Sequence, residues 1–192
     1  MTLTEYAMRH TELAVQMLKG RADANDDMDI SSDGFWKSFW AIAFSIPAML
    51  FMWSMGARSD QHPIEGASLT QRLTTEAILD VGLWVLVAAI FTLALPKFGL
   101  GARTANFIIA RNWTTLFFNY VLAVAFLPGL ATGPDNDLIG ILVLICFVLI
   151  VAGYMRITYQ SLQVSFGTAA LIVGAEIFAS ITLTQMIYSA SV

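Results

Sequence analysis

Residues 138–155 read LIGILVLICFVLIVAGYM, a continuous apolar run without a charged side chain. A helix needs about 20 mostly apolar residues to cross the hydrocarbon core of a bilayer. Four other stretches have the same character, and turn or charge signals separate each from the next. The sequence therefore predicts an all-α fold, an integral membrane bundle of five transmembrane helices with an N-terminal amphipathic cytoplasmic helix. The predicted spans are 35–55, 77–95, 105–127, 138–155 and 164–187.

The composition of the whole chain supports this class. Of the 192 residues, 57% are hydrophobic and 12% are charged, and the mean hydropathy is +0.70. An ordinary soluble domain has roughly 25% charged residues, so this chain has too little charge to cover a soluble globule. The 14 acidic residues outnumber the 10 basic ones, which argues against nucleic-acid binding. A single cysteine excludes an intramolecular disulfide.

The distribution of lysine and arginine predicts the orientation. With the N-terminus inside, eight of the 10 basic residues lie on the cytoplasmic side, and Arg58 and Arg72 lie outside. The positive-inside rule then predicts a cytoplasmic N-terminus and an external C-terminus. Residues 1–34 contain seven acidic residues and no apolar core of a signal peptide. We expect them to form a cytoplasmic helix and an acidic linker, with residues 35–192 as the transmembrane domain.

The N-terminal segment has the signals of a helix. Thr2 and Glu5 fit a capping box, Gly20 fits a helix stop, and the apolar positions between them recur at helical spacing. The polar face mixes acidic and basic residues, so two alternatives remain open: binding to the membrane surface or to a protein partner. Further along, Trp36 and Trp40 flank a lysine at the start of the first span and are predicted interface anchors.

Glu176 is the charged residue closest to the middle of a predicted span. Charged groups at membrane depth are costly and usually face a partner or a cavity. One interpretation is a carboxylate that carries protons or ions. The other is a structural residue that pairs with Arg111 or bonds to Asn112, Thr115 or Asn119. We prefer the structural interpretation because a lone carboxylate makes a poor relay.

A second acidic residue, Asp80, is predicted about one turn inside the outer end of its span. Gln185 lies at a compatible depth in the last span and is its predicted partner. Hydrogen bonds of this kind join transmembrane helices and are worth roughly 1 kcal/mol each. The full predicted polar cluster consists of Glu176, Arg111, Asn112, Asn119, Asp80 and Gln185.

The sequence predicts no catalytic, cofactor-binding or metal-binding residue. His10 and His62 both lie outside the predicted spans, which excludes a haem held by two histidines inside the bundle. Nucleotide-binding and hydrolase motifs are also absent from the sequence. We therefore expect a non-enzymatic protein without a cofactor.

Residues 29–40, DISSDGFWKSFW, followed by Pro47, resemble the start of small inner-membrane proteins of alphaproteobacteria. The resemblance implies a bacterial inner-membrane protein with a bundle of about five helices and a cytoplasmic head. The overall layout is also similar to that of Yip1-type membrane proteins. Neither resemblance implies an activity or a catalytic residue.

These observations favour an accessory, scaffold or assembly subunit of a larger membrane complex. Its expected partners are the lipid bilayer and other membrane subunits or a second copy of the chain, with no nucleic acid. One alternative is a small transporter or channel that uses Glu176, with Asn112 and Asn119 along the path. Another is a lipid-binding or lipid-modifying protein that uses Trp36, Trp40 and Arg111 at the inner rim.

Overall fold

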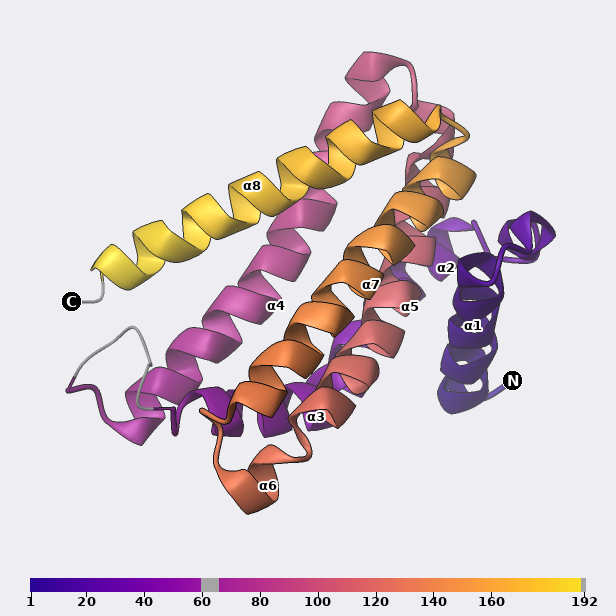
Figure 1. The fold of residues 1–192 in the computed structure, drawn as a ribbon. Coiled ribbons are helices and arrows are strands. Elements are labelled where there is room, and N and C mark those ends of the chain that lie inside the picture. Colours follow the sequence, from indigo (N-terminus) through magenta and orange to yellow (C-terminus); the bar gives the residue numbers. More distant parts are fainter. Residues whose placement is uncertain (60–65, 191–192) are drawn as a thin grey trace.

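The computed structural model describes residues 1–59 and 66–190 and is all-α. The described residues are 84% helical and contain no strand (Figure 1). Five helical stretches are long and apolar enough to cross a membrane. They confirm the prediction of an all-α protein with five such helices. Their bounds are Ser32–Gly56, Leu69–Phe98, Gly101–Thr132, Asp137–Leu162 and Phe166–Ser189.

The described residues form eight α-helices and two short 3₁₀ helices, and three of the spanning stretches combine two helices each. In chain order they are α1 (Leu3–Leu18), η1 (Ala22–Asn25), α2 (Ser32–Ser38), α3 (Trp40–Gly56), α4 (Leu69–Ala94), η2 (Leu95–Phe98), α5 (Gly101–Phe126), α6 (Gly129–Thr132), α7 (Asp137–Leu162) and α8 (Phe166–Ala190).

Helix α5 forms the centre of the bundle. It packs against α3 on one side and α7 on the other, and α1 covers part of the same helix. Helix α8 starts beside the end of α7 and diverges from it along its length (Figure 1). Its far end meets the start of α4, where the Tyr188 hydroxyl donates to Glu76 Oε1 at 2.7 Å. The bundle is therefore closely packed around α5 and looser between α4 and α8.

The helices extend beyond the apolar runs from which the sequence predicted them. Helix α4 begins at Leu69 rather than at 77, because Ser68 and Gln71 form a capping box that starts the helix in a polar stretch. Helix α5 begins at Gly101 rather than at 105. Arg111 is consequently the eleventh residue of a 26-residue helix and lies closer to the helix centre than expected.

The first span is interrupted, whereas the sequence predicted one continuous helix over 35–55. The Phe39 N–H donates to the Trp36 carbonyl at 3.2 Å, and the Ile42 N–H donates to the Phe39 carbonyl at 3.0 Å. These three-residue hydrogen bonds tighten the chain into a 3₁₀-like turn between α2 and α3. The Ser38 hydroxyl donates to the Phe35 carbonyl at 2.7 Å beside the same turn.

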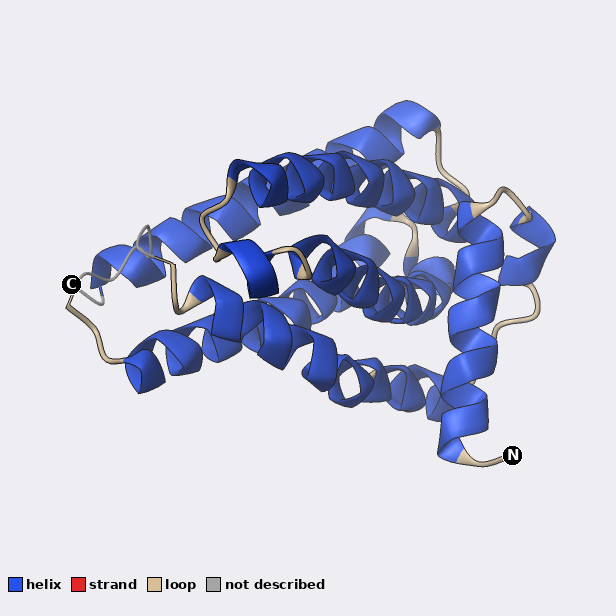
Figure 2. Ribbon diagram, turned by 60° about the horizontal axis from the view of Figure 1, so that its bottom comes forward, coloured by secondary structure: helices blue, strands red, loops and turns tan. Residues whose placement is uncertain are grey.

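Helix α1 lies against the bundle, and the capping box of Thr2 and Glu5 is present. The helix runs across the bundle rather than along it (Figure 2). Its Tyr6 and His10 rings lie 6.0 and 5.9 Å from the Trp113 ring near the middle of α5. The chain's own helices therefore cover one face of α1, and its cytoplasmic location stays a prediction. The buried residues of α1 are Tyr6, Ala7, His10, Leu13, Ala14 and Met17.

The linker after α1 is held to it through Asp29. The Tyr6 hydroxyl donates to Asp29 Oδ2 at 3.2 Å, and the Asp29 N–H donates to His10 Nε2 at 3.3 Å. The Ser31 N–H donates to Asp29 Oδ1 at 3.1 Å. Gly34 must lack a side chain here, because a Cβ would lie 2.0 Å from the Asp29 carbonyl oxygen. These contacts fix the chain's entry into α2, where Ser31 is the N-cap.

His10 makes this junction sensitive to pH. Its Nδ1 lies 2.9 Å from the Tyr6 carbonyl, so Nδ1 carries the proton and Nε2 accepts from Asp29 only in the neutral ring. Burial lowers the pKa of His10 below its ordinary 6.5. The folded state then binds fewer protons than the unfolded state between the lowered pKa and 6.5.

We predict that docking of α1 is strongest above pH 6.5 and weakens as the pH falls below that value. Hydrogen exchange of residues 3–18 measures this change directly. The control variant His10→Gln replaces the imidazole with an amide that can form hydrogen bonds but does not titrate, and it should remove the pH dependence. Equal protection factors of residues 3–18 in the native protein at pH 7.5 and pH 5, corrected for the intrinsic pH dependence of amide exchange, would contradict the prediction.

Candidate functional site

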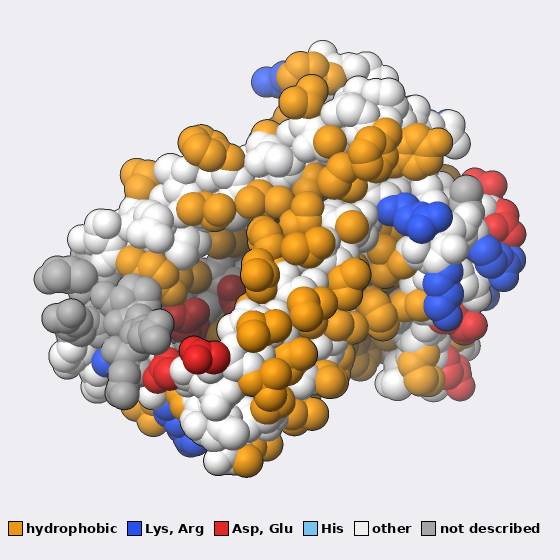
Figure 3. Space-filling model, viewed as in Figure 1, with side chains coloured by type: hydrophobic (Ala, Val, Ile, Leu, Met, Phe, Trp, Pro, Cys, Tyr) orange, Lys and Arg blue, Asp and Glu red, His pale blue; other side chains and the backbone are white. Residues whose placement is uncertain are grey.

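A polar cavity of about 280 Å³ lies inside the bundle at the level of Arg111. The space-filling view shows a hollow between α4, α7 and α8 with acidic side chains inside it (Figure 3). Residues from α3, α4, α5, α7 and α8 line the cavity, so distant parts of the sequence build it together. Its polar lining residues are Asp80, Arg111, Thr115, Asn119, Tyr154, Glu176 and Ser180.

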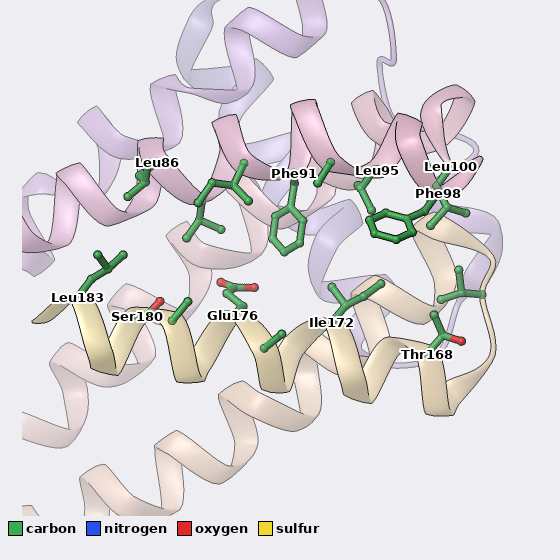
Figure 4. Close-up of a pocket in the computed structure, with 16 residues that line it drawn as sticks. Leu86, Phe91, Leu95, Phe98, Leu100, Thr168, Ile172, Glu176, Ser180 and Leu183 are labelled. Carbon is green, nitrogen blue, oxygen red and sulfur yellow. The ribbon is translucent and has the colours of Figure 1, made fainter.

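Arg111 on α5 and Glu176 on α8 form an ion pair at the inner side of this cavity. Their side chains are only 10% and 12% exposed. Because an isolated charge at this depth is expensive, the pair neutralises two groups that could not remain separate. The Glu176 carboxylate points from α8 toward α4 (Figure 4). The Arg111 side chain thus has its charged partner within the bundle.

Tyr154 on α7 completes the surroundings of Arg111. The guanidinium carbon lies 4.7 Å from the centre of the Tyr154 ring, a cation–π distance. The Tyr154 hydroxyl is 2.8 Å from Thr115 Oγ1, and Thr115 is one turn beyond Arg111 on α5. One guanidinium therefore connects α5, α7 and α8.

Asn112 makes a second set of interhelical bonds beside the cavity, although it does not line the cavity itself. The Trp84 indole N–H donates to Asn112 Oδ1 at 2.8 Å, and Asn112 Nδ2 donates to Ser38 Oγ at 2.9 Å. All three residues are buried. The amide joins α5 to α4 and to the tightened turn after α2, in a region where lipid cannot satisfy polar groups. Asn112 is therefore a structural tie.

Asp80 and Gln185 do not form the predicted pair. Asp80 Oδ2 accepts a 2.7 Å hydrogen bond from the Trp53 indole N–H on α3, and the Gln185 side chain is exposed on α8. Gln185 has a compatible depth, but the rotation of α8 about its axis leaves its side chain exposed. Sequence depth does not determine this rotation.

The remaining predicted residues have different environments. Asn119 lines the cavity, and its Nδ2 is buried without a hydrogen-bond partner among the described residues. Trp36 and Trp40 are 68% and 50% exposed at the start of the first span, and their anchoring role stays a prediction. The structure brings Glu176, Arg111, Asn119 and Asp80 around one cavity; it places Asn112 beside that cavity and Gln185 outside it.

Sequence reasoning did not find the aromatic partners of this site. Trp53, Trp84 and Tyr154 lie in apolar runs of the sequence, where aromatic residues usually serve for packing. A buried indole N–H or phenol hydroxyl nearly always needs a partner, and this requirement is the signal that could have linked them to the polar cluster. Comparisons with protein-family models, with curated proteins and with solved structures found no match to this chain.

Replacing Asn112 and Asn119 separately tests which amide holds the bundle together. Asn112→Leu leaves the Trp84 N–H buried without its acceptor, and we predict a loss of about 1–3 kcal/mol of stability. Asn119→Leu removes an amide whose nitrogen has no partner and should be neutral or stabilising. Thermal unfolding of the two variants in the same detergent measures the difference, and equal losses would contradict it.

Proposed function

We propose that the protein is a non-enzymatic accessory, scaffold or assembly subunit of a larger membrane complex. The observation that supports this proposal is the use of the intramembrane polar groups as ties between helices. Glu176 pairs with Arg111, Asp80 accepts from Trp53, and Asn112 joins three helical segments. These bonds build a rigid frame, which suits a subunit whose role is to hold a shape for its partners.

We further propose that this subunit lies in a bacterial inner membrane with its N-terminus in the cytoplasm. The Arg156 guanidinium donates to the Leu18 carbonyl at 3.1 Å, so a basic residue near the end of α7 lies beside the end of α1. Arg72, in the first turn of α4 at the opposite end of the bundle (Figure 1), donates to the Ala57 and Ser59 carbonyls at 3.2 Å. This arrangement agrees with the charge asymmetry that predicts the orientation.

The subunit proposal predicts the state of the protein after gentle extraction. In a mild detergent the chain should purify with stoichiometric membrane partners or with a second copy of itself. Light scattering should then give a protein mass clearly above the 21.0 kDa of one chain. A clean monomer without a copurifying protein would overturn the proposal.

Site-directed labelling tests the orientation. In a Cys146→Ser background, Asp27→Cys and Ala131→Cys each place one exposed thiol on opposite predicted sides. An impermeant maleimide applied to intact cells should label position 131 and reach position 27 only after permeabilisation. Labelling of position 27 alone in intact cells would show that the orientation is the opposite of the predicted one.

Transport of protons or ions is the second candidate. One observation favours it, since Asp80 and Glu176 line the same cavity and the chain therefore has two carboxylates at depth. The ion pair opposes it, because Arg111 already neutralises Glu176. Proteoliposomes with the native protein and with Glu176→Gln separate the cases: flux that the substitution abolishes supports transport, and background flux in both excludes it.

A further inference from the structure

A second cavity, of about 600 Å³, lies between α4 and α8 and is almost entirely apolar. Figure 4 shows its two walls, with Phe91 and Leu95 on one side and Ile172 on the other. We call this cavity the α4–α8 groove. It exists because α8 diverges from α7 toward α4, and its volume is typical of ligand sites in proteins.

The α4–α8 groove and the polar cavity meet at three shared residues. Val87, Glu176 and Ser180 line both spaces. Glu176 and Ser180 lie on the α8 wall of the groove (Figure 4). The apolar α4–α8 groove therefore opens into the polar cavity, which contains two carboxylates, a guanidinium and an amide nitrogen without a partner among the described residues. A molecule with an apolar chain and a polar head would match both parts at once.

The charges in the polar cavity indicate which head would fit. Asp80 and Glu176 contribute two negative charges and Arg111 one positive charge, so the lining has a formal charge of −1. The Arg111–Glu176 pair is internally neutral, whereas Asp80 accepts from the Trp53 indole N–H and has no basic side chain as a partner among the described residues, so its ionised form lacks a counter-charge to balance it. A cation provides that balance, whereas an anionic head would face two carboxylates.

Aromatic and amide groups favour the same head. Trp84 and Tyr154 line the cavity, and aromatic faces attract ammonium groups, more strongly where water is excluded. Asn119 Nδ2 is a buried donor without a partner among the described residues, and a hydroxyl or carbonyl on the head would satisfy it.

We propose that the groove and the polar cavity together bind one cationic amphiphile, with its apolar chain between α4 and α8 and its ammonium head beside Asp80. A partner helix would fill the groove but would leave the cavity charge unbalanced, so the amphiphile explains both features. This proposal does not depend on the subunit role, and the site differs from the Trp36 and Trp40 rim.

Three probes that share one alkyl chain length and differ in the head group test the head-group preference of the native protein. Hexadecylamine, hexadecanol and hexadecanoate are titrated into the full-length protein in nanodiscs, and native mass spectrometry counts the bound molecules. We expect one hexadecylamine per protein molecule, bound at least tenfold more tightly than hexadecanoate. Equal binding of all three heads would overturn the proposal.

Two substitutions then separate head recognition from chain binding. Asp80→Asn should reduce the preference for the amine at least tenfold and leave hexadecanol binding unchanged. Ala179→Trp fills the groove and should abolish binding of all three probes. The control Ala89→Trp adds the same side chain at an exposed α4 position outside the groove lining and should bind as the native protein does.

Thermal unfolding of each variant confirms that it is folded before its binding is compared with that of the native protein. The comparison of the three probes on the native protein does not depend on any variant. If Ala179→Trp lowers the mass of a purified oligomer and leaves amine binding intact, the groove is a protein contact and the amphiphile proposal is wrong.

Discussion

The ion pair of Arg111 and Glu176 is the constraint on which the arrangement of this bundle depends. Neither charge is stable alone at membrane depth, so α5 and α8 must present these side chains to each other at one level. That requirement sets both the depth and the rotation of α8. Tyr154 then stacks on the guanidinium and brings α7 into the same arrangement.

The groove and the polar cavity can be understood as consequences of the same pair. Helix α8 reaches inward at Glu176 and meets α4 again through Tyr188 and Glu76, and it leaves an apolar space between these contacts. The polar cavity lies where the pair, Asp80 and Asn119 face one volume. The protein thus combines a fixed frame, which suits a subunit of a complex, with an accessible amphipathic pocket.

The sequence was sufficient for the five apolar helices, because their apolar runs are long enough to cross a bilayer and few other folds accommodate them. It also identified Glu176 and Arg111 as residues that need partners. It could not predict the rotation of each helix, so it paired Asp80 with Gln185 instead of Trp53. It also missed the turn at Phe39, since the neighbouring Ser38 is held there by a hydrogen bond from Asn112 in a distant part of the chain.

A double-mutant cycle on Arg111 and Glu176 tests the account most directly, with the free energy of unfolding measured in one detergent. Arg111→Met and Glu176→Met each leave one buried charge unpaired, and each should cost about 3–5 kcal/mol. The double variant removes both charges and should be more stable than either single variant, which gives a strong coupling between the two sites. If the two losses simply add, the pair does not hold α8 to α5, and the account is wrong.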